Sequence, residues 1–144
     1  MRPALALIAS LLVTGCATPA EPAPEEVVVG ELGDDCAIIA AVAKEYFQFG
    51  PDNPPPPVRF EADYNPRCDW SRHGLAFARY DESAPSGGRV RPWVRFHQPR
   101  YDDEGAVIEV GIMHGPLAGQ GSECRVYSGF AGWMVGGCRR TWVS

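Results

Sequence analysis

Residues 124–138 read CRVYSGFAGWMVGGC, a stretch that begins and ends on a cysteine. If residues 130–132 form a three-residue hairpin loop with Gly132 in the left-handed conformation, the flanking residues pair as two antiparallel strands. The same register sets Cys124 directly opposite Cys138, so turn chemistry and cysteine spacing agree independently. We therefore predict a C-terminal hairpin that is closed by a Cys124–Cys138 disulfide.

A second hairpin is predicted upstream, where apolar and polar residues alternate with the period of a strand. Its strands cover about residues 90–98 and 106–114, joined by a three-residue loop over 103–105 with Gly105 left-handed. This register sets Phe96 opposite Ile112 and Val94 opposite His114. We expect one face in the core, with Val94, Phe96, Ile108, Val110 and Ile112, and one face partly solvated, with Trp93, Arg95, His97, Glu109 and Met113. Weaker alternation indicates further short strands over 58–62 and 75–79.

A helix is predicted over residues 35–48, before these strands. Asp34 and Asp35 are typical N-cap residues. Apolar residues then recur at helical spacing and form one face, with Ile38, Ile39, Val42, Tyr46 and Phe49. Gly50-Pro51 should stop the helix, and the four prolines at 54–57 should form a stiff surface connector.

The cysteines complete the fold prediction. Four follow Cys16, which allows three pairings. With Cys124 paired to Cys138, Cys36–Cys68 remains and would join the helix to the middle segment. The sequence thus predicts an α+β domain with two disulfides, in which one N-terminal helix packs on an antiparallel sheet of four or more strands. This layout resembles that of cystatin-like and NTF2-like domains, an analogy of arrangement that transfers no function.

The N-terminal segment carries a targeting signal. Residues 1–15 read MRPALALIASLLVTG, with Arg2 before an apolar stretch of about ten residues. Val13-Thr14-Gly15-Cys16 resembles the lipobox of bacterial lipoprotein precursors. The resemblance implies cleavage before Cys16, acylation of Cys16 and, with Ala17 next, sorting to the outer membrane facing the periplasm. An ordinary signal peptide cut after Ala17 is the alternative.

The next residues are expected to form a tether. Residues 16–33 are rich in proline, alanine and glutamate, which is typical of a solvated linker, and the domain would span 34–144. The net charge of −5 arises from six acidic residues within 17–43. From Lys44 onward, twelve acidic and twelve basic residues balance. This distribution argues against nucleic-acid binding.

The sequence contains no familiar catalytic or metal-binding motif. G-x-x-x-x-G-K-[ST], H-E-x-x-H, G-x-S-x-G and C-x-x-C are all missing from the 144 residues. No apolar run reaches the roughly 18 residues that a membrane-spanning helix needs. We therefore expect a non-enzymatic protein without a metal or cofactor.

Two groups of residues are candidates for binding. Trp93 alternates with Arg91 and Arg95 on the solvated strand face, and tryptophan and arginine are typical interface anchors. His114 lies beside the glycine-rich loop 114–122 and is the best candidate for a polar group at a pocket.

These candidates lead to three hypotheses. The first is an envelope lipoprotein that binds a partner protein through Trp93 and its arginines. The second is a small-ligand-binding or hydrolytic pocket, with His114 at its mouth and a lining of Ile38, Val42, Tyr46, Val94 and Ile112. The third is an inhibitor of an envelope hydrolase that inserts the Cys124–Cys138 hairpin. The sequence does not predict the oligomeric state.

Overall fold

The computed structural model describes residues 30–61, 63–84 and 91–144, with the helical side chains described from Asp34 onward. Its elements, in chain order, are α1 (Gly30–Glu45), β1 (Val58–Arg59), the 3₁₀ helix η1 (Trp70–His73), β2 (Trp93–Phe96), β3 (Arg100–Asp102), β4 (Gly105–Gly115), β5 (Ala118–Gly129) and β6 (Gly132–Val143). The predicted signal peptide, lipidated Cys16 and most of the tether lie outside the described residues.

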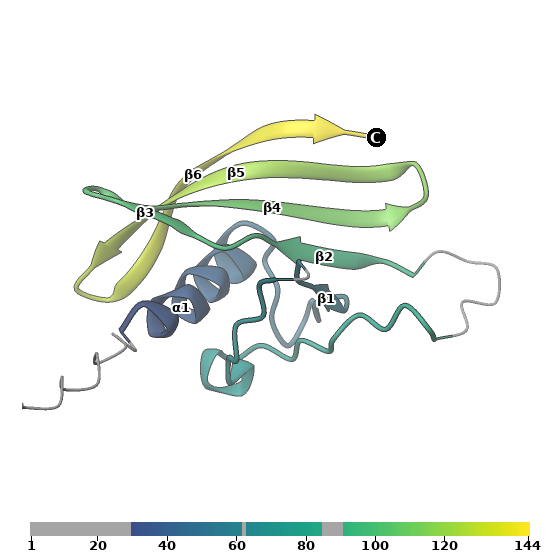
Figure 1. Cartoon of the computed structure of the whole chain (residues 1–144), viewed down its shortest axis with the longest axis horizontal. Coiled ribbons are helices and arrows are strands. Elements are labelled where there is room, and N and C mark those ends of the chain that lie inside the picture. The colour runs from purple at the N-terminus through teal and green to yellow at the C-terminus, as the bar shows by residue number, and fades with distance from the viewer. Residues whose placement is uncertain (1–29, 62, 85–90) are drawn as a thin grey trace, which may run out of the picture.

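The strands form one sheet with α1 against one face (Figure 1). The strand order is β1-β2-β4-β5-β6, and β3 pairs with the other end of β4. Every pair is antiparallel except β1 and β2, which run parallel. The predicted α+β arrangement, one helix on an antiparallel sheet of four or more strands, is confirmed, apart from the single parallel pair. No helix within the described ranges is long and apolar enough to cross a membrane.

The core lies between α1 and the inner face of the sheet. Ile38, Ile39 and Val42 of α1 are completely buried. The sheet contributes buried side chains at alternate positions, namely Val94, Phe96, Ala106, Ile108, Val110, Ile112, Cys124 and Val126. This alternation matches the core face that the sequence predicts for the upstream hairpin.

The helix boundaries differ from the prediction. α1 begins at Gly30 and ends at Glu45, so Asp34 and Asp35 lie within the helix and do not cap it. Asp35 is only 2% exposed, and two tyrosines from other segments donate hydrogen bonds to its buried carboxylate. Gln48 adopts the left-handed conformation, with φ of 58°, and turns the chain so that Phe49 is buried outside the helix.

Both disulfides are as predicted. Cys36 pairs with Cys68 at a Cα–Cα distance of 5.6 Å, and Cys124 pairs with Cys138 across β5 and β6 at 4.0 Å. The turn between β5 and β6 is different, because Gly129 pairs with Gly132 and the loop has two residues. A register shift beyond Val126 compensates for the shorter turn, and Cys124 still lies opposite Cys138.

The register of β2 against β4 is shifted by two residues from the prediction. Val94 pairs with Ile112, and not with His114. One residue of the shift arises because the turn before β4 has two residues and not the predicted three, so Asp102 pairs with Gly105. Gly105 has a φ of 144°. The other arises between β2 and β3, where Pro99 is buried. A shift of two preserves the alternation of faces, so the inner and outer side chains are as predicted.

The two weaker strand predictions are largely wrong. Among the described residues 58–61, only the two residues of β1 form a strand, and the 75–79 stretch forms a single bridge, between Arg79 and Val58. Val58 donates its N–H to the carbonyl of Ala78 and accepts the N–H of Tyr80. This segment is therefore tied to the edge of the sheet through one residue.

Candidate functional site

The outer face of β2 carries a cluster of aromatic and cationic side chains around Trp93. The guanidinium carbon of Arg59 lies 5.4 Å from the centre of the Trp93 ring, and that of Arg95 lies 5.8 Å from it. The Tyr80 ring is 6.1 Å from the Trp93 ring, between their centres. Arginine over an aromatic face is an attractive electrostatic arrangement. We call Arg59, Tyr80, Arg91, Trp93 and Arg95 the Trp93 platform.

Backbone pairing brings the platform together. Parallel pairing of β1 and β2 places Arg59 beside Arg95, and the hydrogen bonds of Val58 bring Tyr80 to the same edge. Glu82 holds Arg59 through an ion pair of 2.6 Å. Arg91 is exposed just before the strand. Of the three predicted members, Trp93 and Arg95 lie together and are half-buried, whereas Arg91 is exposed with no contact to either. Arg59 and Tyr80 were missed by sequence reasoning.

Arg95 has no carboxylate partner among the described residues. The Nε of Arg95 is also the only buried side-chain polar atom there that lacks a hydrogen bond. Its row across the sheet explains this, since Arg95 pairs with Gly111, Gly111 with Gly121, and Gly121 with Trp142. Two glycines and a tryptophan provide no acidic side chain beside the guanidinium.

The neighbouring rows of the outer face form a network of ion pairs. Arg100 contacts Glu109 at 2.9 Å and Glu123 at 3.3 Å, and Arg139 contacts Glu123 at 3.2 Å. Arg125 pairs with Asp102, and its hydrogen bond lowers the pKa of that carboxyl. A shallow depression of about 360 Å³ lies among these pairs. Since the carboxylates here already have arginine partners, the positive and negative charges of this region compensate one another.

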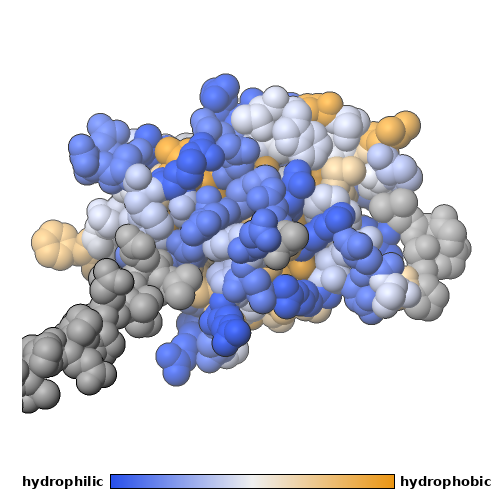
Figure 2. Space-filling model, viewed as in Figure 1, coloured by the Kyte–Doolittle hydropathy of each residue, from blue (hydrophilic) through white to orange (hydrophobic). Residues whose placement is uncertain are grey.

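The surface in the view of Figure 2 is mostly hydrophilic, with small hydrophobic patches near the ends of the long strands. Two large hydrophobic side chains are especially exposed. Leu117 is 84% exposed in the turn between β4 and β5, and Phe130 is fully exposed in the turn between β5 and β6. The Trp93 platform differs from both, because its aromatic rings are held by neighbouring side chains.

His114 does not sit at the predicted pocket. Ile38, Val42 and Val94 are completely buried in the packed core, so they cannot line an open cavity. His114 is exposed and instead borders a groove of about 380 Å³ between the sheet and the proline-rich connector. The other lining residues of this groove are Phe47, Phe49, Asn53, Pro54, Pro56, Pro92 and Ile112.

No catalytic arrangement surrounds His114 in the described part of the chain. Its possible partners are engaged elsewhere: Ser122 is buried against the hydroxyl of Tyr46, Asp81 accepts hydrogen bonds from Ser83, and Glu82 pairs with Arg59. The Nδ1 of His97 lies 2.9 Å from a carboxylate oxygen of Glu61. Residues 30–61, 63–84 and 91–144 contain no group of three or more histidine, cysteine, aspartate or glutamate side chains that could hold a metal ion.

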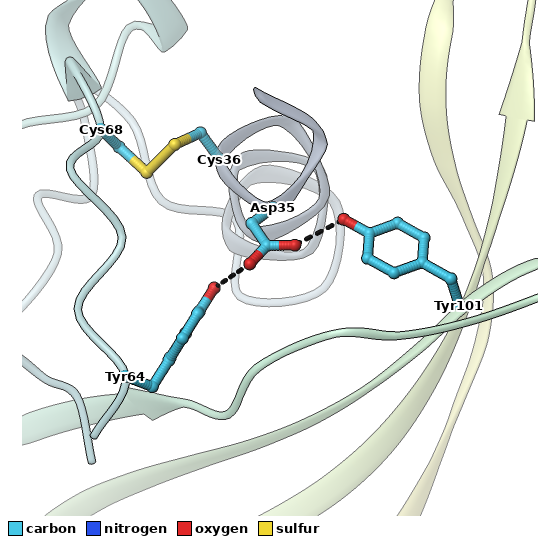
Figure 3. The surroundings of a disulfide bond; sticks show 5 residues. All are labelled: Asp35, Cys36, Tyr64, Cys68 and Tyr101. Atoms are coloured by element: carbon cyan, nitrogen blue, oxygen red, sulfur yellow. Dashed lines mark hydrogen bonds between the residues drawn. A yellow bond between two sulfur atoms is a disulfide. The ribbon is translucent and has the colours of Figure 1, made fainter. Parts of the chain in front are cut away.

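A second polar cluster, which sequence reasoning missed, lies beside the Cys36–Cys68 disulfide (Figure 3). Tyr64 donates a hydrogen bond to one carboxylate oxygen of Asp35 at 2.8 Å, and Tyr101 donates to the other at 2.5 Å. Burial and the bond to Asp35 raise the pKa of Tyr64 well above its ordinary value. This cluster joins α1, the middle segment and β3, and we interpret it as structural.

Comparison with protein-family models, with curated proteins and with solved structures finds no match to this chain. We therefore infer function from the residues and their geometry.

Proposed function

We propose that this chain is a bacterial envelope lipoprotein whose domain binds a partner protein through the Trp93 platform. The observation that carries the binding proposal is the packing of two arginines against Trp93, with Tyr80 adjacent. Tryptophan, tyrosine and arginine dominate the binding energy of protein interfaces. Because neighbouring side chains hold these groups in place, little conformational freedom would be lost on binding.

The proposed location rests on the N-terminal sequence and the disulfides. Val13-Thr14-Gly15-Cys16 fits lipoprotein processing, and two disulfides fit an oxidising compartment such as the periplasm. Acyl chains on Cys16 would hold the domain at the outer membrane, and the 13 residues between Cys16 and the start of α1 at Gly30 could span at most roughly 43 Å. Metabolic labelling with a fatty-acid analogue tests this: label on the wild-type chain should disappear in Cys16→Ser, and label retained by that variant would refute lipidation there.

The binding proposal is tested by capture from living cells. The tagged full chain is cross-linked briefly in its native host, and the proteins that come with it are identified by mass spectrometry. We expect one dominant envelope protein to be captured with the wild-type chain. The captured amount should be strongly reduced for Trp93→Ala and for Arg91→Ala, a variant at an exposed position. Urea unfolding of both variants separates lost binding from lost folding. Capture that persists in both variants would contradict the platform as the binding surface.

A second candidate function is inhibition of an envelope hydrolase by the hairpin of β5 and β6. Phe130 favours it, because this fully exposed side chain stands at the tip of a hairpin that a disulfide closes. A rigid, protruding aromatic residue suits insertion into an apolar pocket. Phe130→Ser should then abolish capture while Trp93→Ala preserves it, which is the opposite of the pattern expected for the platform.

A further inference from the structure

We propose that Arg95 is a binding site for an acidic side chain of the partner protein, so that an aspartate or glutamate docks against the outer face of β2. This inference rests on the proposed function and goes beyond it by naming the chemistry that the platform recognises. Three features of the described residues support it: the burial of Arg95, its lack of a counter-charge, and the excess of cations around it.

Arg95 is an unusual arginine within residues 30–61, 63–84 and 91–144. Only Arg95 and Arg125 are half-buried there, and every other arginine is exposed. Arg125 has a carboxylate partner in Asp102, whereas the Arg95 guanidinium lies by the ring of Trp93 and pairs with no carboxylate of the described residues. A partly desolvated charge without a counter-charge is unfavourable, and its buried Nε adds an unmade hydrogen bond. A carboxylate supplied by a partner at the accessible end of the guanidinium would offset the cost of the unpaired charge.

The chain itself offers no free carboxylate beside Arg95 in the described residues. The glycines at 111 and 121 follow it across the sheet, and the ring of Trp142 lies over both of them. Glu109, in the next row, is engaged by Arg100 at 2.9 Å. The guanidinium is therefore left for a group from outside, with the Trp93 ring in the next row and the Trp142 ring at the far end of its own row.

The charge around Arg95 favours an acidic ligand. Arg79 and Arg91 are exposed cations in the segments that flank Arg59 and Trp93, whereas the charge of Arg59 is compensated by Glu82. Glu82 pairs with Arg59, and Asp81, which accepts hydrogen bonds from Ser83, interacts with the charge of Arg91. Arg79 and Arg95 are therefore left without a carboxylate partner in the described residues. Arginine binds a carboxylate through paired hydrogen bonds of defined geometry, which gives orientation as well as attraction.

The test follows the side-chain N–H signals of the ¹⁵N-labelled full chain in detergent micelles by NMR. The probes are a hexaglutamate peptide, a hexaglutamine peptide and sodium phosphate, compared at equal ionic strength. We expect hexaglutamate to shift the Arg95 Nε–H and Trp93 indole N–H signals saturably, while hexaglutamine leaves them in place. Arg95→Gln should lower the affinity for hexaglutamate by about tenfold or more. Arg140→Gln, at an exposed position of β6, should leave this affinity unchanged.

Several results would overturn the inference. If phosphate shifts the Arg95 signal as much as hexaglutamate does, the site binds anions in general. If hexaglutamate leaves the Arg95 signal in place, Arg95 is not a binding site for a carboxylate. If replacing Glu21, Glu25 and Glu26 by glutamine moves the Arg95 signal of the free chain, the carboxylate comes from the tether and not from a partner.

Failure of the proposed function is distinguishable from failure of this inference. A partner captured in cells equally by wild type and Arg95→Gln would leave the platform as an interface without a carboxylate contact. Saturable binding of hexaglutamate at Arg95, with no partner captured, would support the acidic site and contradict the partner-binding lipoprotein.

Discussion

At the scale of single residues, Arg95 and Arg125 form an informative pair. Both are half-buried on the outer face, and only Arg125 has an acidic partner in the described chain. A charge kept without a counter-charge suggests that function, and not stability, maintains Arg95. The lack of a carboxylate partner for Arg95 could not be predicted from the sequence. Alternation places Arg95 on the outer face, but it does not indicate which arginines pair with a carboxylate.

This difference gives a prediction about stability. Arg95→Met keeps the side-chain length and removes the unpaired charge, so we expect the free energy of unfolding to stay unchanged or to rise by up to about 1 kcal/mol. Arg125→Met removes one partner of an ion pair, so we expect the free energy of unfolding to fall. Urea titration of both variants measures this, and a marked loss in Arg95→Met would show that Arg95 stabilises the fold.

The Asp35 cluster predicts a dependence on alkaline pH. Tyr64 has a raised pKa in the folded state, so its contribution is fully present below the unfolded pKa of about 10 and is lost as pH rises beyond it. Tyr64→Phe should be less stable at neutral pH and should lose stability less steeply above pH of about 10. Free energies of unfolding measured across that range test this, and parallel pH profiles for wild type and variant would contradict it.

At the scale of elements, the hairpins show how far local patterns reach. Both turns contain two residues where the sequence indicated three, yet the faces of every predicted core position in β2 and β4 are correct. Side-chain alternation fixes the face of a residue, whereas a shift in register depends on details such as the positive φ of Gly105 and the buried Pro99. Those details have no distinct signal in the sequence.

Two glycines in the turns provide a matched test. Gly105 and Gly132 both have positive φ, of 144° and 106°. A Cβ on Gly105 would lie 2.2 Å from the carbonyl oxygen of Val126, whereas a Cβ on Gly132 would meet open space. We expect Gly105→Ala to lower the free energy of unfolding by about 3 kcal/mol and Gly132→Ala by about 1 kcal/mol. Equal losses in thermal or urea unfolding would contradict the packing around Gly105.

At the scale of the whole molecule, the fold class and both disulfides could be predicted, and two of the five platform residues could not. Trp93 and Arg95 lie on one strand, so alternation alone brings them to one face. Arg59 and Tyr80 arrive through parallel pairing and a single bridge between segments far apart in the sequence. The Asp35 cluster, too, joins residues 29 and 66 positions apart. Such contacts are fixed by tertiary packing and have no local pattern.

The disulfides make a prediction about the molecule as a unit. Cys36 and Cys68 are 32 residues apart and Cys124 and Cys138 are 14 apart, so the first bond restrains the unfolded chain more. We expect a loss of about 4 kcal/mol for the double variant of Cys36 and Cys68 to alanine, and about 3 kcal/mol for that of Cys124 and Cys138. Thermal unfolding of the two double variants measures the order, and the reverse order would contradict it.

The central claim is that the Trp93 platform binds a partner protein in the cell envelope. Site-specific photo-cross-linking tests it most directly, with a photoreactive amino acid placed in the full chain at position 91 or, as a control, at the exposed position 104 in the turn before β4. Position 91 should yield one dominant cross-linked envelope protein that position 104 does not. Equal labelling from both positions, or none from position 91 at good expression, would contradict the claim.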